Sequence, residues 1–577
     1  MRCVLLNAVI LLASLLAAQV SPPSPAPAQP PAPPATDKFG GLTALPSPGG
    51  ATGYFRLEEA TRGDGVKRWN FVSPMGNALY LRAVQNATYA FIEPALMQSR
   101  HGSDHTPWFT LTLKRIQAWG FNVIGDYAHL AFLPIGNPSA GPGGAAIKMP
   151  FILMPRPAAQ ATYHPEVCGS KQPIKDIVAG VPASYGIWDG TPMLDPFDPM
   201  WPACVKGEIQ QWRNTFSGDF HKTPWIVGIT TDDADFLWAL KGAGDNPLKP
   251  NSYPHMGFLI AVANLAYKDH SDPKLYAKYA WSAYLQKKYG TVEALNAAWG
   301  SNYTSFGDDG GYGAGSGLLD EDGRHREWLG GDPYLLHGAK PAVQADLDAM
   351  LYQYVLQFES VEVQGIRAYD KHHLIFGPNA LGGQGAFGTR PQVLPALAEA
   401  GVDALFLNYD SVYPQNLAVA TAAYEKTGKP VLLWYGLSAN QDSSWHGQSS
   451  TTDADYRTQE KRGQVYAEDQ QYIFNAQAAD GSFPILGIDF WGLTDDKAAE
   501  HTNWGLMSNR GNPYDGKCAV RATAVKDSWG AQCGGESAEY GDFLSAVTAA
   551  NAAVVQRFLG EAVPAPKVPA VSPANGR

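Results

Sequence analysis

Residues 207–216, "GEIQQWRNTF", and residues 225–233, "WIVGITTDD", decide the fold class of this chain. The first stretch has a helical pattern. The second is apolar and β-branched from Ile226 to Thr230 and ends in acidic residues. A helix that leads into a buried strand is the repeating unit of a parallel α/β protein.

The same alternation extends over several hundred residues. Two strands joined by the turn "SPMGN" are expected within 71–85. Helical patterns that each precede an apolar strand follow at 108–120, 343–369, 393–401, 418–428 and 463–477. The corresponding strands are expected at 121–127, 373–379, 402–410, 430–436 and 485–496. The number of units approaches eight and each strand ends in polar or aromatic residues, so we expect an α/β fold, a (β/α)8 TIM barrel with its site at the strand carboxyl ends.

The two ends of the chain have the composition of an export signal and of linkers. Arg2 precedes an apolar run and then small residues, which is a secretory pattern, and the run is too short to span a membrane. We therefore expect a secreted protein, extracellular or periplasmic, with no membrane span. The expected parts are a signal peptide at 1–18, a Pro/Ala-rich linker at 19–37, a barrel domain at 38–562 with long βα-loop insertions at about 135–200 and 241–342, and a disordered tail at 563–577.

Four cysteines remain after removal of the signal, an even number that suits disulfides in an exported protein. We expect Cys168 to pair with Cys204 and Cys518 with Cys533, although the sequence permits three pairings. No pair has C-x-x-C spacing, and the glycine-rich stretch 307–317 fits neither a dinucleotide nor a phosphate loop. We therefore expect no metal and no cofactor.

Charge and aromatic content indicate the class of partner. The net charge of -11 argues against nucleic acid or an anionic membrane as the main partner. The 16 tryptophans and 27 tyrosines suit a poly- or oligosaccharide, because aromatic planes stack on sugar rings, although most of them are expected in the core.

Three acids follow the strand quoted first, namely Asp232, Asp233 and Asp235. Carboxyl groups at this edge of a barrel are candidates for catalysis. Capping of the following helix is an equally good explanation for any one of them.

Several stretches taken together resemble β-agarases and β-galactosidases of the glycoside hydrolase clan of (β/α)8 barrels. They are "DPFDPMW" at 195–201, "KYGTVEALNAAWGSNYTSF" at 288–306, "AYDKHHLIFGPN" at 368–379, "VDALFLNYDSVYP" at 402–414, "RTQEKRGQVYAEDQQYIF" at 457–474, "GIDFWGLTDD" at 487–496 and "NWGLMSNRGNPY" at 503–514.

The resemblance implies hydrolysis of glycosidic bonds by two carboxyl groups, one as acid/base after the fourth strand and one as nucleophile after the seventh. In its register Asp232 and Asp233 occupy the Asp and Asn of an I-G-x-x-x-D-N-E pattern, and Ala234 occupies the acid/base Glu. Tyr435 occupies the nucleophile Glu of K-P-V-L-x-x-E. Both usual catalytic glutamates are therefore expected to be replaced.

Other residues offer replacements for the two glutamates. Asp233 or Asp235 supplies an acid one methylene shorter, and Tyr435 is a nucleophile of the sialidase kind or, with Trp434, a core or sugar-stacking residue. Partner acids at strand ends are Asp126, Asp410, Asp489, Asp495 and Asp496, where Asp489 alternatively points into the barrel or at a helix. The expected substrate-binding residues are Asp126, Asn379, Asn408, Tyr409, Trp434, Asp489 and Trp491, with turn formation as the alternative for Asn379, Asn408 and Tyr409.

Two functional hypotheses follow. The first is a secreted glycoside hydrolase that cleaves a poly- or oligosaccharide with a displaced acid pair. The second is a carbohydrate-binding barrel that has lost its catalytic glutamates. Two carboxyl groups that face each other across the strand ends would favour the first.

Overall fold

Eight parallel strands form the centre of the fold. Their bounds are β5 (Leu81–Val84), β6 (Val123–Ile124), β7 (Phe151–Leu153), β8 (Ile226–Asp233), β9 (Leu374–Asn379), β10 (Leu405–Asp410), β11 (Val431–Gly436) and β12 (Ile485–Trp491). They are paired in the order β10-β11-β12-β5-β6-β7-β8-β9. The backbone N–H of Asp403, just before β10, donates to the carbonyl of Ile375 in β9 at 2.7 Å, which joins the two ends of the sheet. The predicted (β/α)8 barrel is confirmed.

This computed structural model describes sixteen ranges of the chain, which from Ala35 onward belong to one structural unit. The ranges are 34–61, 65–92, 94–133, 148–177, 193–215, 220–233, 276–307, 317–320, 340–379, 392–410, 416–437, 459–495, 504–508, 525–527, 530–532 and 540–561. The expected signal peptide, most of the linker, the tail and the Cys518–Cys533 pair lie outside them. No helix within these ranges is long and apolar enough to cross a membrane.

Side chains alternate along each barrel strand because successive residues point to opposite faces. One set fills the inside of the barrel and includes Val227, Phe376 and Leu432. The other set, which includes Ile226 and Leu433, packs against the surrounding helices. Both faces are covered, which explains the nearly continuous apolar runs in the sequence.

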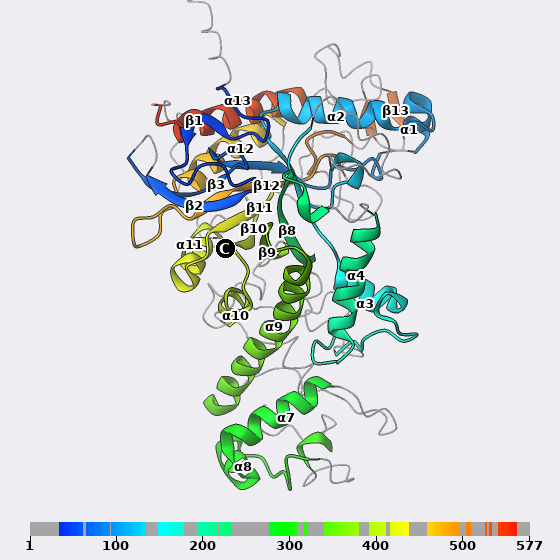
Figure 1. Ribbon diagram of the computed structural model, residues 1–577, viewed down its shortest axis with the longest axis vertical. Coiled ribbons are helices and arrows are strands. Elements are labelled where there is room, and N and C mark those ends of the chain that lie inside the picture. The colour runs from blue at the N-terminus through cyan, green and yellow to red at the C-terminus, as the bar shows by residue number, and fades with distance from the viewer. Residues whose placement is uncertain are drawn as a thin grey trace, which may run out of the picture. The chain divides into compact units, whose positions relative to one another are not determined.

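Helices surround the strands (Figure 1). Those that pack around the barrel are α2 (Thr106–Ala118), α4 (Trp201–Thr215), α9 (Pro341–Tyr369), α10 (Val393–Ala400), α11 (Asn416–Thr427), α12 (Gln459–Phe474) and α13 (Tyr540–Phe558). Shorter helices are α1 (Pro94–His101), α3 (Pro157–Tyr163), α7 (Tyr276–Tyr289) and α8 (Val292–Trp299). The last two form the helical pair expected in the second insertion.

A four-stranded antiparallel sheet precedes the barrel, and the sequence predicted only the strand pair on either side of the turn at 73–77. Its strands are β1 (Leu42–Pro46), β2 (Arg56–Thr61), β3 (Lys67–Val72) and β4 (Asn77–Leu79), in the order β1-β4-β3-β2. Phe39, Phe55 and Phe71 join the interior cluster of the barrel, and Phe39 lies 4.6 Å from Trp225, just before β8 begins. The sheet therefore covers the amino ends of the strands, and the opposite end carries the candidate site.

The third barrel strand, β7, lies inside the stretch that was expected to be an insertion. It has three residues between Pro150 and Pro155, too few to show the apolar run of a buried strand. The stretch at 135–200, expected to be only an insertion, therefore includes one strand of the barrel.

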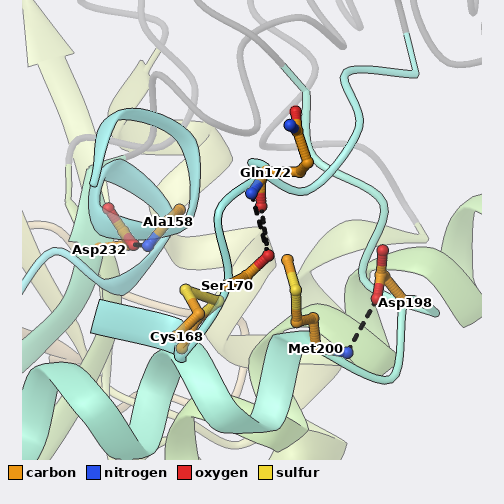
Figure 2. Close-up of a disulfide and its surroundings, with 8 residues drawn as sticks. Ala158, Cys168, Ser170, Gln172, Asp198, Met200 and Asp232 are labelled. Atoms are coloured by element: carbon orange, nitrogen blue, oxygen red, sulfur yellow. Dashed lines mark hydrogen bonds between the residues drawn. A yellow bond between two sulfur atoms is a disulfide. The ribbon is translucent and has the colours of Figure 1, made fainter. Parts of the chain in front are cut away.

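The predicted Cys168–Cys204 disulfide is present (Figure 2). It joins the 3-10 helix η2 (Pro165–Cys168), which follows α3, to the first turn of α4. The 36-residue separation corresponds to about 3–4 kcal/mol of stabilisation in the loop-entropy model.

Candidate functional site

Asp233 is the last residue of β8, the fourth barrel strand when β5 is counted first. Its side chain is 8% exposed, and its Oδ2 accepts a hydrogen bond from Arg156 Nη2 at 3.1 Å. The hydroxyl of Tyr127 donates to the same oxygen. A guanidinium and a phenol thus share one oxygen of this carboxyl group as their acceptor.

Tyr127 reaches Asp233 from an uncommon backbone conformation. It follows β6 and has a φ of 54°, in the left-handed region that costs a non-glycine residue free energy. Asn86, which follows β5, has a φ of 52°. Both residues lie at strand carboxyl ends, where such conformations commonly serve function.

An aromatic cluster lies beside Asp233. Trp491 is 5.7 Å from Trp434 and 5.7 Å from Tyr127, measured between ring centroids, and Trp504 is 6.4 Å from Trp434. Trp434 and Trp491 belong to the interior side of the barrel wall and keep a small exposed area. Rings in this arrangement offer faces and edges on which a sugar can pack.

Two further acids of the predicted site, Asp126 and Asp489, are fully buried. The backbone N–H of Asp126 donates to Asp489 Oδ2 at 3.4 Å, and Thr230 Oγ1 donates to Asp126 Oδ2 at 3.4 Å. Burial raises the pKa of Asp126 well above its ordinary value, and the charges of Asp489 and Asp233 raise it further. Burial also raises the pKa of Asp489 well above its ordinary value. Burial therefore favours the protonated form of both carboxyl groups.

The predicted asparagines also lie on these strands. Asn379 is in register with Asp233 on the neighbouring strand, and Asn408, Trp434 and Asp489 form one row across β10, β11 and β12. The Oδ1 atoms of Asn379 and Asn408 are buried and accept no hydrogen bond within the described part of the chain. They are available acceptors for a ligand hydroxyl.

Tyr409 and Tyr435 lie on the other face of the barrel wall. Their rings stack at 5.8 Å, and their hydroxyls donate to the two carboxylate oxygens of Asp469 on α12, at 3.1 and 2.8 Å. Both residues are fully buried in the layer between strands and helices. This placement differs from the expected substrate contact of Tyr409 and nucleophilic role of Tyr435, and it supports the core role that the sequence left open for Tyr435.

Asp232 likewise points away from the barrel mouth. It is fully buried, with Oδ2 accepting the backbone N–H of Ala158 at 2.5 Å (Figure 2). The structure therefore separates Asp232 from Asp233, although the sequence places them together as candidate catalytic residues. The register of β8 shifts between Thr230 and Asp233, which accompanies this separation.

The remaining acids do not join the site in the described part of the chain. Asp495 is buried and accepts hydrogen bonds from Tyr540 and from the backbone of Gly505. The predicted catalytic Asp235, like Ala234 and Asp496, lies outside the described residues, as does the side chain of Asp410. Within those ranges no group of three His, Cys, Asp or Glu side chains is arranged to hold a metal ion.

Sequence reasoning missed Tyr127, Arg156 and Trp504. Tyr127 stands next to the candidate Asp126, and its place at a predicted strand end was an available signal. Arg156 follows the short strand β7, so its position depended on a strand that the sequence did not reveal.

The (β/α)8 fold, with Asp233 at the end of its fourth strand, is similar to that of solved agarase structures. An agarase structure, AgWH50C, superposes with a TM-score of 0.61 at 17% identity over 91% of this chain and 68% of its own. An exo-β-agarase gives 0.62 at 16% identity over 91% and 68% of the two chains. The structure of BpGH50 gives 0.56 at 13% identity over 91% and 86%.

Sequence comparison also finds an agarase. β-Agarase A of Vibrio sp. (strain JT0107) is 21% identical over 341 residues, which are 58% of this chain. The match spans only 27% of the length of that relative. No family model matches the chain.

Proposed function

We propose that this protein is a secreted glycoside hydrolase-like protein that acts on a neutral poly- or oligosaccharide at the carboxyl end of its barrel. The observation that carries the proposal is the position of Asp233, a carboxylate beside Tyr127, Arg156 and the tryptophan cluster at the end of the fourth strand. The likeness to solved agarase structures supports the fold. It makes agarose and β-galactans the first substrates to test.

The chemistry we assign to Asp233 is that of the charged carboxylate of a glycosidase. Glycosidases need one carboxyl group that holds a proton and one that does not. Burial raises the pKa of Asp126 and of Asp489, whereas Asp233 forms an ion pair with Arg156. Asp233 in this scheme activates a water molecule that attacks the anomeric carbon, and a protonated acid supplies the leaving oxygen with its proton.

The proposal is tested by reducing-sugar release from a panel of glycans that includes agarose and β-galactans. We expect turnover by the wild type, and a loss of about 100-fold or more in Asp233→Asn, because the amide cannot act as a base. Glu425→Gln, an exposed carboxyl group of α11, is the matched control and is expected to keep full activity. Equal rates for Asp233→Asn and the control would contradict the role of Asp233.

One observation favours a second function, carbohydrate binding without cleavage. The tyrosine that occupies the position of the usual nucleophile points toward α12 and not into the barrel. Asp126 and Asp489 are also fully buried, which separates them from any ligand in this conformation. The same panel distinguishes the two functions, because a binding protein retains one glycan without releasing reducing ends.

Export is part of the proposal. The secretory pattern of residues 1–18 and the Cys168–Cys204 disulfide both support an oxidising compartment. Recovery of the mature protein, cleaved near Ala18, from the medium or periplasm would test it. Retention of the uncleaved chain inside the cell would contradict it.

A further inference from the structure

The buried carboxyl group of Asp232 holds two backbone groups at once. Its Oδ2 accepts the N–H of Ala158 at 2.5 Å, and its Oδ1 accepts the N–H of Asp233 at 2.8 Å. Ala158 lies two residues after Arg156, at the start of α3. Asp232 therefore connects the strand that carries Asp233 to the segment that carries Arg156.

Two glutamates of α9 lie behind Asp232. Glu362 lies close enough to Asp232 for the charge of Asp232 to raise the pKa of Glu362, and Glu359 Oε2 accepts the hydroxyl of Thr231 at 3.2 Å. All three carboxyl groups are fully buried. The other charged groups that act on Asp232 are Arg156, which favours its ionised form, and Asp233, which opposes it.

Three carboxyl groups in a dry interior cannot all be charged. Burial raises the pKa of Asp232 and of Glu359 to about 8, and it raises the pKa of Glu362 well above its ordinary value. Asp232 is therefore largely uncharged at neutral pH. The guanidinium of Arg156 then has Asp233 as its charged partner.

The segment that follows Arg156 is fastened at a second point. Cys168, at its far end, is joined to Cys204 of α4, and the backbone N–H of Arg156 points at the buried Glu208 of the same helix at 3.5 Å. Figure 2 shows the disulfide and the Asp232–Ala158 hydrogen bond on either side of the segment. The 156–168 segment is therefore held to β8 by the hydrogen bond from Ala158 to Asp232, and to α4 by the disulfide of Cys168.

We propose that Asp232 is a positioning residue, which holds the 156–168 segment so that Arg156 stays on Asp233 and the barrel mouth binds its glycan. This inference rests on the proposed function in one respect, namely that Asp233 and its neighbours contact the glycan. It assigns Asp232 a role different from catalysis, since its carboxyl group does not reach the mouth. Ionisation of Asp232 strengthens the hydrogen bonds that it accepts from Ala158 and Asp233, so the segment is held more firmly at alkaline pH.

The test combines hydrogen exchange with a double-mutant cycle. Asp232→Asn replaces one acceptor oxygen by an NH₂ group, which cannot accept the N–H of Ala158. We expect amide exchange in residues 156–163 to become at least about 10-fold faster, because that segment loses an anchoring hydrogen bond. Affinity for agaro-oligosaccharides, measured by calorimetry, is expected to fall about 10-fold in Asp232→Asn and in Arg156→Ala. The double variant should lose little more than either, because both changes remove the same contact.

A pH series adds a readout that simple destabilisation does not supply. Wild-type affinity is expected to rise as pH rises through about 8, whereas Asp232→Asn is expected to be flat there because it has no proton to lose at this site. Asp198→Asn is the matched control, since Asp198 Oδ1 caps the backbone N–H of Met200 at 2.8 Å in the same region without a link to Arg156 (Figure 2). If Asp232→Asn does not fold, Ala158→Pro removes the donor instead, at a helix position that tolerates proline.

The outcomes are distinct. Unchanged exchange in residues 156–163 overturns the positioning role whether or not any glycan binds. Faster exchange with additive losses of affinity overturns it as well, because the segment would then act independently of Arg156. If the wild type binds no glycan, the proposed function fails, and the pairing of Arg156 with Asp233 is read instead from a crystal structure of Asp232→Asn. An undisturbed Arg156 in that structure also overturns the proposal.

Discussion

The side chain of Tyr435 is fully buried in the layer between the barrel strands and the surrounding helices. Its hydroxyl shares Asp469 with that of Tyr409, and both rings lie between the strands and α12. The register of β10, β11 and β12 places Asn408, Trp434 and Asp489 on the opposite face. The residue next to Tyr435 therefore faces the mouth, and Tyr435 itself supports the barrel wall.

Tyr435→Phe tests this assignment. We expect glycan turnover or binding to change by less than about 2-fold, since the hydroxyl does not face the mouth. The free energy of unfolding should fall by about 1 kcal/mol, the usual contribution of one hydrogen bond. Steady-state kinetics and urea unfolding measure the two effects. A 100-fold loss of turnover at unchanged stability would instead indicate a nucleophilic tyrosine.

At the scale of elements, Asp346 attaches the α7–α8 pair to the barrel. This fully buried residue of α9 accepts hydrogen bonds from Tyr289 at 2.6 Å and from Trp299 Nε1 at 2.8 Å, and Lys288 pairs with it. Its three partners come from both helices of the pair. One carboxyl group thus fixes a helical insertion that has few other polar contacts with α9 among the described residues.

Asp346→Ala is expected to loosen the attachment of α7 and α8 to α9. The buried indole N–H of Trp299 and the hydroxyl of the half-buried Tyr289 lose their acceptor, and leaving a buried donor without a partner costs about 1–3 kcal/mol. We expect the stability measured by urea unfolding to fall by at least about 2 kcal/mol, with faster proteolysis within residues 276–307. Asp348→Asn, on the same helix, is the control. Equal behaviour of the two variants would show that other contacts hold the pair.

The elements also show what sequence patterns can and cannot predict. Seven of the barrel strands have apolar runs long enough to recognise, and with the helices between them they predict the fold class. The strand β7 has three residues, so its existence follows only from closure of the barrel. The orientations of Asp232 and Asp233 depend on register shifts within β8, which a residue pattern does not contain. Arg156 could not be assigned to the site for the same reasons.

At the scale of the whole molecule, buried carboxyl groups govern the response to pH. The groups whose pKa is raised by burial are Asp126, Asp195, Asp232, Glu359, Glu362 and Asp489. In the folded chain they bind protons that the unfolded chain has already released. Their contribution to stability is therefore complete at acidic pH and is lost as pH rises through the raised values.

The melting temperature should accordingly fall between about pH 5 and pH 8, the interval between the ordinary carboxyl values and the raised pKa of about 8 of Asp232 and Glu359. Scanning calorimetry across this interval measures the slope. Glu359→Gln, which has no proton to release, is expected to reduce it. A melting temperature that rises from pH 5 to pH 8 would contradict the buried, proton-holding state of these groups.

The central claim is that the barrel mouth, with its tryptophans beside Asp233, is where a glycan binds. The most direct measurement is calorimetric titration of agaro- and β-galacto-oligosaccharides into the wild type, Trp434→Ala and Tyr279→Ala, the last an exposed aromatic of α7. We predict that the wild type and Tyr279→Ala bind alike and that Trp434→Ala binds at least about 10-fold more weakly, because a stacked ring contributes of the order of 1 kcal/mol or more. Equal binding by Trp434→Ala and the wild type would contradict the account.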